Sequence, residues 1–458
     1  MAPRREPNHR LARLIEESKA SNAALAHRVN ELAARAGVNR AYTHTSIRNW
    51  TVRAMVPDAP APALLALALS ERLGRTVSLS EMGMADTPTP TVETGLNFHR
   101  DPDQALNLAA EYWSTVDRRS FVKASPFALT AYGPAAMRWM AVPADPPHAR
   151  VAGARVGRAD ILELRAAADE ARRWDSKFGG GNWRASMVTD CLTQRAAPLL
   201  RGTFTDKVGS ELFAATAELA RVAAWHDVDM GNHASAQAHF VQALRLARAS
   251  GDRAVGSYVL ATMALHVYLC GFPHEAVDMA EGAYERAKDH DAPARVLAFA
   301  QLAKARAHGL AGDARAAAAA LSLCEHLVDA ADTDERDPDW LAYLTRARVA
   351  ADAAEIYRDL KLPAEALLWN QQATAMPAAD FSRAVGIRQT VIATAHLQQR
   401  NLEPGLESGE RALTILSTVR SNRSRSYLRT LTTALNPWRT EPNVADFLHR
   451  ADHVLTAS

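Results

Sequence analysis

One segment of the chain has the residue types and spacing of a metal site. Trp225-His-Asp-Val-Asp-Met-Gly-Asn-His233 places His226, Asp229 and His233 at intervals of three and four residues, which is one face of a helix. Imidazole and carboxylate groups arranged in this way can hold a metal ion. The segment also falls at a predicted turn between two helices, where polar residues cap helix ends and face solvent. We therefore expect no metal there, and the elemental composition of the purified protein would test this.

Two further segments match catalytic motifs only in part. Gly179-Gly180-Gly181 has neither the preceding strand nor the following Lys-Ser/Thr of a phosphate-binding loop, so we predict a flexible connection. Cys191 has no His or Asp in local reach and adjoins Leu192 on an apolar stripe, which favours an inert core thiol. We find no catalytic constellation and no cofactor motif, and we expect a protein that is not an enzyme.

The segment Thr43-His-Thr-Ser-Ile-Arg-Asn-Trp50 offers chemistry of another kind. Thr43 can cap a helix, and Ile47 and Trp50, three residues apart, fix one face of that helix to a core. Arg binds guanine with a bidentate fork, Asn binds adenine, and Thr contacts a base edge or a thymine methyl group. We predict that this helix contacts double-stranded DNA, and a solvated surface helix is the alternative. The opposite face carries His44, Thr45, Arg48 and Asn49.

The N-terminal part of the chain is basic. Residues 1–57 contain ten Arg or Lys and four Glu, a net charge of +6, whereas the whole chain has a net charge of +2. The remainder is therefore mildly acidic. A compact basic region suits a polyanionic partner. We expect Arg53 and the Arg4-Arg5 arm to contact phosphates, which position a protein on DNA without reading its sequence.

Apolar spacing predicts five short helices in this region, which we assign to a helix-turn-helix domain over residues 1–84. The second helix begins at Ser21 or Asn22 and ends at Gly37, and a fourth spans Ala63 to Leu73. A last short turn surrounds Met82. Alternating Thr and Pro then predict a stiff linker over residues 85–95.

The C-terminal part has a repeat. Small residues recur at steps of 40, 41, 49 and 39, and a second alanine lies twelve positions before each of them. Two antiparallel helices approach closely only where the side chains at their crossing are small. The pattern predicts stacked helix pairs that resemble tetratricopeptide repeats, in an α-solenoid over residues 160–458. The paired positions are Ala224 and Ala236, Ala264 and Ala276, Ala305 and Ala317, Ala354 and Ala366, and Ala393 and Gly405.

Glycines mark the turns within these pairs. Gly231, Gly271 and Gly312 each lie five residues before the second small residue, where a left-handed cap favours glycine. Between the two regions we expect a small helical segment over residues 96–142 and a linker over residues 143–159. The whole chain is 48% apolar and only 6% aromatic, contains no convincing strand, and has no run of eighteen apolar residues. Together with three widely spaced cysteines, this predicts an all-α, cytoplasmic protein without membrane contact.

The first helix of each pair is expected to form the concave wall of the solenoid, a surface suited to a peptide or a partner helix. Arginines with aromatic neighbours can hold a peptide that carries carboxylates. A polar inner wall without any ligand is an equally common arrangement. The inward positions are Arg221, Trp225, Tyr258, Tyr268, Arg306, Arg348, Glu355, Arg358 and Gln398.

Several of these segments carry a family resemblance. Leu25-Ala26 and the Ser-Ile-x-x-Trp core of Thr43–Trp50 resemble the helix-turn-helix of lambda-repressor-like bacterial regulators. The layout is similar to large actinobacterial transcriptional regulators with C-terminal tetratricopeptide-like repeats, and Phe178-Gly-Gly-Gly-Asn-Trp-Arg184 resembles a glycine-rich block that precedes those repeats. The chain departs from the usual motif between Ala26 and Ile47, where eleven extra residues lengthen the second helix or its turn.

This resemblance implies a transcriptional regulator in which a ligand resets the DNA affinity of a dimer, as in the peptide-sensing regulators of firmicutes, which share the two-part plan. A single small module buries only roughly 600–1,000 Å² on DNA, so we expect a homodimer formed through the solenoid. The alternative is a tetratricopeptide scaffold that does not bind DNA and whose basic head contacts another protein.

Overall fold

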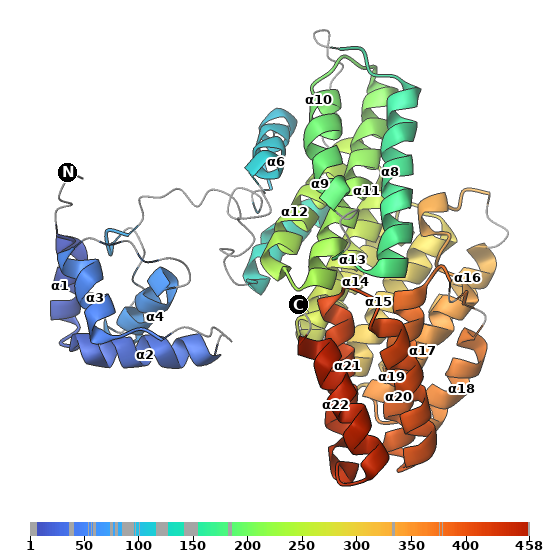
Figure 1. Ribbon diagram of the computed structural model, residues 1–458. Coiled ribbons are helices and arrows are strands. Elements are labelled where there is room, and N and C mark those ends of the chain that lie inside the picture. The colour runs from blue at the N-terminus through green and yellow to red at the C-terminus, as the bar shows by residue number, and fades with distance from the viewer. Residues whose placement is uncertain are drawn as a thin grey trace. The chain divides into compact units, whose positions relative to one another are not determined.

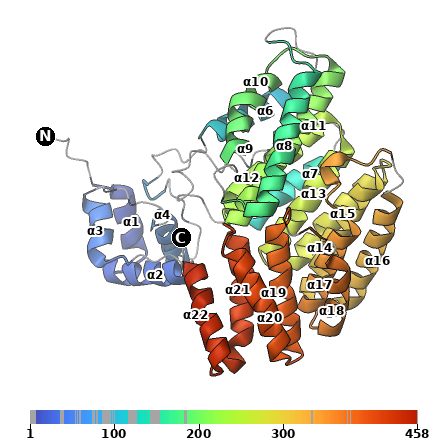
Figure 2. The same ribbon diagram turned by 45° about the vertical axis from the view of Figure 1, so that its right-hand side comes forward.

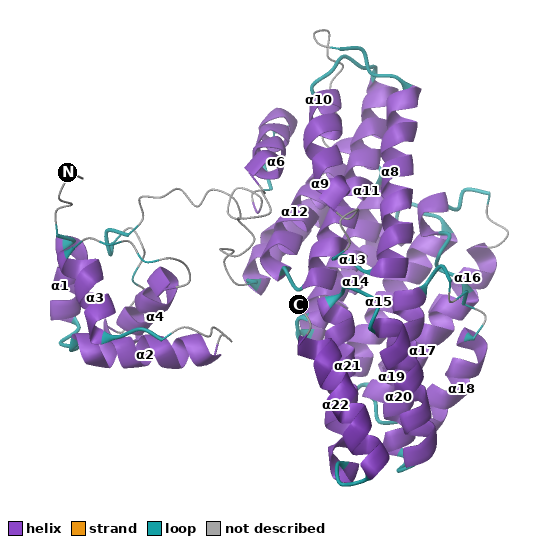
Figure 3. Ribbon diagram, in the orientation of Figure 1, coloured by secondary structure: helices purple, strands orange, loops and turns teal. Residues whose placement is uncertain are grey.

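The computed structural model confirms an all-α fold (Figures 1 and 3). It describes residues 7–35, 41–53, 55, 57, 61–73, 77, 81–84, 96, 98–99, 101–115, 127–141, 154–181, 186–331, 335–374, 376–377 and 379–456. Within these residues every regular element is a helix, and a single bridge pairs Arg155 with Thr203. The chain divides into two compact units, Met1–Pro90 and Thr91–Ser458, which we call the head and the solenoid. None of the described helices is long and apolar enough to cross a membrane.

The head packs its described helices around one apolar core. Leu11, Leu25, Ile47, Leu65 and Met82 are completely buried in it. The predicted end of the second helix at Gly37, most of the predicted fifth helix and the predicted linker lie outside the described residues. The helices are α1 (His9–Glu17), α2 (Asn22–Arg35), α3 (His44–Val52) and α4 (Ala61–Leu73).

Asn8 joins three segments of the head. Its side-chain oxygen accepts a hydrogen bond from the Leu11 amide at 3.0 Å and caps α1, while its side-chain nitrogen donates to the Met82 carbonyl at 2.9 Å. Its own amide donates to the carbonyl of Thr51, near the end of α3. Gly83 has a φ of +64°, and a Cβ there would lie 2.8 Å from the Asn8 Oδ1 atom. Glycine is therefore required where this turn meets Asn8.

The solenoid begins with helices that precede the repeats. The described residues within 96–142, a range expected to form a separate segment, share one hydrophobic core with the repeats, and Trp113 and Trp139 are almost completely buried in it. A Cβ at Gly256 would lie 2.5 Å from the Trp139 ring, so the first repeats fit closely around this indole. The elements are α6 (Pro102–Thr115), η2 (Leu129–Ala131), α7 (Tyr132–Ala141), α8 (Arg158–Phe178), α9 (Ser186–Cys191), the π-helical turn η4 (Leu192–Ala196) and α10 (Ala197–Leu200).

Six antiparallel helix pairs follow (Figure 2). The long step of the repeat falls between α16 and α17, where the short helix η5 (Asp339–Leu341) is inserted, and η6 (Asn436–Trp438) lies between the last two helices. The pairs are α11 (Asp206–Met230) with α12 (His233–Ser250), α13 (Arg253–Leu269) with α14 (Pro273–Lys288), α15 (Ala294–Ala311) with α16 (Ala314–Ala331), α17 (Arg346–Asp359) with α18 (Pro363–Ala373), α19 (Ser382–Gln398) with α20 (Leu402–Leu416), and α21 (Asn422–Leu435) with α22 (Pro442–Thr456).

The small residues that predicted the repeat are all buried at helix contacts. Each of the nine alanines is at most 1% exposed. A Cβ at Gly405 would lie 3.0 Å from the Leu397 side chain and 3.3 Å from the Ala393 carbonyl, so this crossing is closer than a side chain allows comfortably. The predicted turn glycines have left-handed φ angles, +78° at Gly231, +87° at Gly271 and +83° at Gly312. The repeat pattern read from the sequence is confirmed.

The last helix pairs return to the first helices, so α8 and α11 contact α19 and α21. Two backbone hydrogen bonds of 3.0 Å join Arg420 to Phe178 and Gly181. A Cβ at Gly179 would lie 2.5 Å from the Arg420 carbonyl oxygen, and one at Gly180 would lie 2.8 Å from the His226 carbonyl oxygen. The prediction of a flexible glycine connection was wrong, because these glycines allow close backbone contact where the solenoid closes.

Candidate nucleic-acid interface and ligand cavity

Helix α3 is capped and anchored as its sequence predicts. The Thr43 hydroxyl accepts a hydrogen bond from the Ser46 amide at 3.4 Å, and the Ser46 hydroxyl accepts one from the Thr43 amide at 3.1 Å. This reciprocal capping box fixes the start of the helix. Ile47 is fully buried and Trp50 is 6% exposed, so one face of α3 belongs to the core.

The opposite face of α3 is open to solvent. His44, Thr45 and Arg48 are exposed, and Asn49 is half-buried. Val52, four residues after Arg48 and so on the same side of the helix, is 54% exposed and adds an apolar group that the sequence analysis did not select. Apolar side chains can contact the methyl group of thymine.

The arginines of the head differ in whether they already pair with an acidic side chain. Arg53 is exposed directly after α3, whereas Arg4 and Arg5 lie outside the described residues. Arg28 holds Glu71 through two hydrogen bonds of 2.7 and 2.8 Å and also pairs with Glu31, so it is engaged within the head. Arg48 and Arg53 form no ion pair with any residue in the described part of the chain, which leaves both cations available to a partner.

The connection between α2 and α3 is held from the middle of α2. The Asn30 side chain donates to the Tyr42 carbonyl at 2.8 Å and accepts from the Tyr42 amide at 2.7 Å. The Tyr42 ring then meets Trp50 edge-on, with 5.6 Å between ring centroids. Helix α2 is described over Asn22–Arg35, and the rest of the stretch between Ala26 and Ile47 lies partly outside the described residues. Asn30 thus fixes the chain at Tyr42, two residues before α3 begins.

Comparison with known proteins shows a similarity within the head. Residues 11–85 match the family model of the SP15 N-terminal domain. The match includes all of α2, α3 and α4 and most of α1, and it covers less than half of the chain. The search of curated proteins found no match to the chain.

The second candidate site is a cavity of about 1100 Å³ within the solenoid. The first helices of successive pairs line it, as predicted for the concave wall, and Arg221, Trp225, Arg306 and Arg348 are among its lining residues. Eight Arg or Lys side chains and five Asp side chains face it together with seven aromatic rings. The wall therefore combines excess positive charge with flat apolar surfaces, a combination that suits an anionic ligand with an apolar body.

Arg221 is a buried cation of this wall that forms no direct ion pair with any described residue. It is only 4% exposed, and its guanidinium lies over the Tyr258 ring at 4.6 Å. Its Nε atom has no hydrogen-bond partner, and Arg221 forms no ion pair within the described part of the chain. Tyr258 lies behind the wall, stacked on Trp340 at 4.7 Å, with its hydroxyl 2.9 Å from that of Tyr343. The charge of Arg221 acts on the buried carboxylate of Glu218, which does not line the cavity. A bound anion would give this guanidinium a direct partner on the cavity side.

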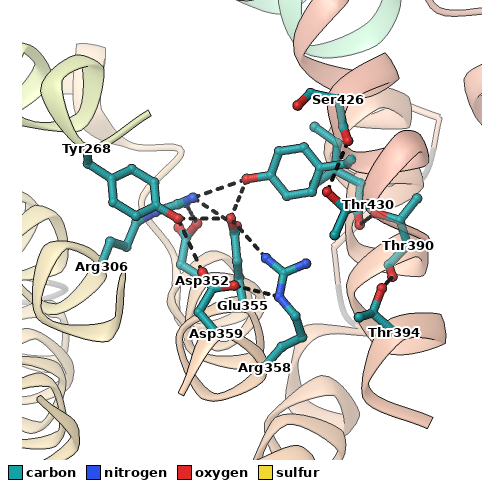
Figure 4. A network of polar contacts seen from close by, with 12 residues as sticks. Tyr268, Arg306, Asp352, Glu355, Arg358, Asp359, Thr390, Thr394, Ser426 and Thr430 are labelled. Atoms are coloured by element: carbon teal, nitrogen blue, oxygen red, sulfur yellow. Dashed lines mark hydrogen bonds and ion pairs between the residues drawn. The ribbon is translucent and has the colours of Figure 1, made fainter. Parts of the chain in front are cut away.

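Other residues predicted to hold a ligand instead bind one another (Figure 4). Arg306 pairs with Glu355 at 2.8 Å, and the Tyr268 hydroxyl donates to the same carboxylate at 3.3 Å. Arg358 pairs with Asp359 at 2.7 Å. Tyr268, Glu355 and Arg358, all predicted groove residues, do not line this cavity. Their charges are satisfied within the protein, because they join α13, α15 and α17 into one buried network.

This network also reaches the closing helices of the solenoid. The Tyr427 hydroxyl of α21 donates to Glu355. Gln398 of α19 donates to the Arg358 carbonyl at 3.0 Å, so this predicted groove residue also contacts the protein itself. The remaining predicted position, Tyr258, supports Arg221 from behind. Of the nine predicted groove residues, four line the cavity and five stabilise its wall.

A second buried network of charged residues lies where the last helix pairs meet α8 and α11. Arg383 makes a bidentate contact with Asp175 at 2.6 and 2.7 Å and also pairs with Asp229 at 3.0 Å. Asp229 in turn accepts hydrogen bonds from the Gly180 amide at 2.8 Å and from Arg423 at 3.2 Å. Burial is the largest influence on Asp175 and opposes its ionisation, but the attractions of Arg383, His226 and Arg423 together outweigh it and lower the pKa of this carboxyl below its ordinary value. The two residues therefore form a charged pair.

The three residues that first suggested a metal site are separated. Helix α11 ends at Met230, so His226 and Asp229 belong to it, whereas His233 begins α12. His226 approaches Asp175, with 3.9 Å between Nε2 and Oδ1, and Asp229 is completely buried with Arg383. The predicted turn is confirmed, because the left-handed Gly231 separates the two helices, but His226 and Asp229 are buried and do not face solvent as expected.

Proposed function

We propose that the protein is a DNA-binding transcriptional regulator of the cytoplasm, with α3 as its reading helix and the solenoid as its sensor. Its resemblance to actinobacterial helix-turn-helix regulators with tetratricopeptide-like repeats motivates this proposal. The observation that carries it is the two-sided character of α3. Ile47 and Trp50 hold the helix to the core, while His44, Thr45, Arg48 and Asn49 face outward.

Each outward side chain has a proposed role. Arg48 donates a bidentate pair to guanine, Asn49 pairs with adenine, and Thr45, His44 and Val52 contact base edges or a thymine methyl group. Arg53, with the Arg4-Arg5 arm, binds phosphates and sets the register of the helix in the groove. The net charge of +6 over residues 1–57 favours this assignment, because phosphate contacts supply most of the affinity for any sequence.

The test is selection of bound sequences from a random duplex pool with the full-length protein, followed by gel shifts of variants. We expect Arg48→Ala to weaken binding to the selected site by about 1–3 kcal/mol and to relax one base preference. Arg53→Ala and Arg4→Ala should weaken binding to all sequences alike and reduce its salt dependence. Arg28→Ala is the matched control, because Arg28 is engaged with Glu71 and Glu31.

Two outcomes would contradict this assignment. Equal losses on every sequence for Arg48→Ala would remove Arg48 from the reading role. Duplex binding by the full chain that is absent, or insensitive to salt, would favour the alternative of a repeat scaffold whose head contacts another protein, since phosphate binders lose affinity steeply with salt.

The proposed regulator acts as a homodimer. One small module buries too little surface on DNA for tight, specific binding, so two heads on a two-fold site are needed. The solenoid is the proposed dimerisation surface. A symmetric consensus in the selected sequences, together with a dimer mass by light scattering, would support this arrangement, and a monomer bound to an asymmetric site would contradict it.

The proposed effector is an anion with an apolar body, such as a peptide with a free carboxylate, bound in the cavity beside Arg221 and Trp225. The support is the buried guanidinium of Arg221, which forms no direct ion pair within the described part of the chain and lines the cavity among aromatic rings. Calorimetric titration with peptides that have free or amidated C-termini would test it. Arg221→Met should abolish any preference for the free carboxylate, whereas a preference that survives this substitution would place the ligand elsewhere.

A further inference from the structure

A cluster of three metal-binding side chains lies outside both candidate sites. His233 is the first residue of α12, His266 lies in the last turn of α13, and Cys270 caps the end of α13. The His233 Nδ1 atom is 3.1 Å from the His266 Nε2 atom and 3.6 Å from the Cys270 sulfur. All three donor atoms lie within 4.8 Å of one another.

We propose that His233, His266 and Cys270 bind a zinc ion that joins the first two helix pairs of the solenoid. Tetrahedral zinc has bonds of about 2.0–2.1 Å to imidazole nitrogen and about 2.3 Å to sulfur, which places two nitrogens about 3.3 Å apart and nitrogen and sulfur about 3.5 Å apart. The two distances at His233 agree with these values within a few tenths of an ångström. Two imidazoles and a thiolate form a zinc donor set, and a water molecule completes the tetrahedron.

The surroundings of His266 fix its ring for this role. The Tyr132 hydroxyl lies 2.8 Å from the His266 Nδ1 atom, and Phe127 packs edge-on against the ring at 5.0 Å. With zinc on Nε2, the proton sits on Nδ1 and donates to the Tyr132 oxygen. Such a second partner orients a metal-bound histidine and makes it a better ligand. Tyr132 belongs to α7, so the helices before the repeats also contribute to the site.

The two imidazoles are already nearly coplanar. Their planes differ by 16° and their centroids are 5.3 Å apart, an edge-to-edge arrangement with the two donor nitrogens facing each other. Without the ion, one nitrogen donates to the other. A modest rotation of each ring would turn both nitrogen lone pairs toward a cation that lies to one side of the line between the two nitrogens.

The location indicates a structural role. His233 follows the turn between α11 and α12, and Cys270 precedes the turn between α13 and α14, so one ion would link the ends of two successive pairs. Residues this close in space but 37 apart in sequence resist separation when a metal bridges them. We therefore expect zinc removal to lower the unfolding temperature without requiring DNA or an effector.

The test uses full-length protein without a polyhistidine tag, dialysed against metal-free buffer. We expect about one zinc per chain by elemental analysis, and replacement by Co²⁺ should give the absorption of a tetrahedral cobalt thiolate. Cys270→Ser, which keeps nearly the same volume, should lose the metal and the thiolate-to-cobalt band. The cobalt spectrum of the unaltered protein decides the matter even if this variant fails to fold, because it must show a thiolate ligand.

Two matched controls separate this site from adventitious binding. Cys191→Ser removes another half-buried thiol and should leave the zinc content unchanged. His449→Gln disrupts an exposed pair on α22, in which the His449 and His453 Nε2 atoms are 3.3 Å apart, and should also leave it unchanged. The proposal is overturned if the protein holds no zinc, if Cys270→Ser retains it, or if only His449→Gln removes it.

Discussion

The head and the solenoid place the same type of ion pair in opposite surroundings. In the head, Arg28 joins α2 to Glu71 of α4 by a bidentate contact whose side chains are 29% and 48% exposed. In the solenoid, Arg383 joins α19 to Asp175 of α8 by a bidentate contact whose side chains are each 6% exposed. The geometry is alike, but only the second pair is removed from water, so only it is costly to break.

This difference follows from how each unit uses its surface. The head is small, packs one apolar core and leaves its polar groups outside, where a partner can reach them. The solenoid closes on itself, so the inner faces of its first helices meet other helices or a cavity instead of bulk water. Polar side chains at those positions must find partners within the protein, and the two buried networks supply them.

The largest expected effect comes from breaking the buried pair. Arg383→Met leaves both Asp175 and Asp229 without their main cation, and we expect it to lower the free energy of unfolding of the solenoid by about 3–5 kcal/mol. Urea titration followed by hydrogen exchange and mass spectrometry would report each unit separately.

Arg28→Met is the matched control in the head. The same change in side chain removes an exposed bidentate pair, so we expect no measurable change in the unfolding of either unit. A large loss in the head, or none in the solenoid for Arg383→Met, would contradict the view that burial decides the contribution of these pairs.

A glycine substitution tests how tightly the solenoid packs where its last helix pairs meet its first helices. Gly179 has φ +81° and ψ 166°, a region open essentially to glycine alone, and a Cβ there would lie 2.5 Å from the Arg420 carbonyl oxygen. We expect Gly179→Ala to cost about 2–4 kcal/mol, from backbone strain and loss of the close contact. Gly271→Ala is the control, because Gly271 also has a positive φ but its Cβ would meet nothing within 4 Å. Its cost should be only about 1–2 kcal/mol, and equal costs would argue against a tight closure.

A smaller effect is expected from Asp227, a buried acid of α11 that pairs with no Arg or Lys in the described part of the chain. Burial raises the pKa of Asp227 to about 7, although hydrogen bonds from Ser235 and Asn232 act in the opposite direction. His239 lies 3.6 Å away, but burial lowers its pKa to about 3, so the imidazole is neutral at neutral pH. The folded protein therefore holds a proton on Asp227 that the unfolded chain releases between about pH 4 and pH 7.

The sign of the pH dependence follows. Since the folded-state pKa of Asp227 is raised, its contribution to stability is present below about pH 4 and is lost as the pH rises toward 7. Asp227→Asn, which cannot ionise, should be more stable than the unaltered protein by about 1–3 kcal/mol at pH 8 and similar at about pH 4. Thermal unfolding at both values measures this, and a variant that is destabilised equally at both would show that the carboxylate is needed for another reason.

The amino-acid sequence by itself determined the helices, their pairing and the two faces of α3. Small residues at Ala224 and Ala236 and their equivalents, and the pattern of Ile47 and Trp50, reflect periodicity within a helix or between adjacent helices. Such local rules need no knowledge of distant segments.

Only the tertiary structure decided which polar residues meet. The closure brings Gly179 to Arg420 and Asp175 to Arg383, and the stacking of successive pairs brings His233 to His266 and Cys270. These partners lie far apart along the chain, and their types alone do not reveal whether they face water, a cavity or each other. Burial sets the energy of a charge or a donor group, and burial is a property of the folded chain.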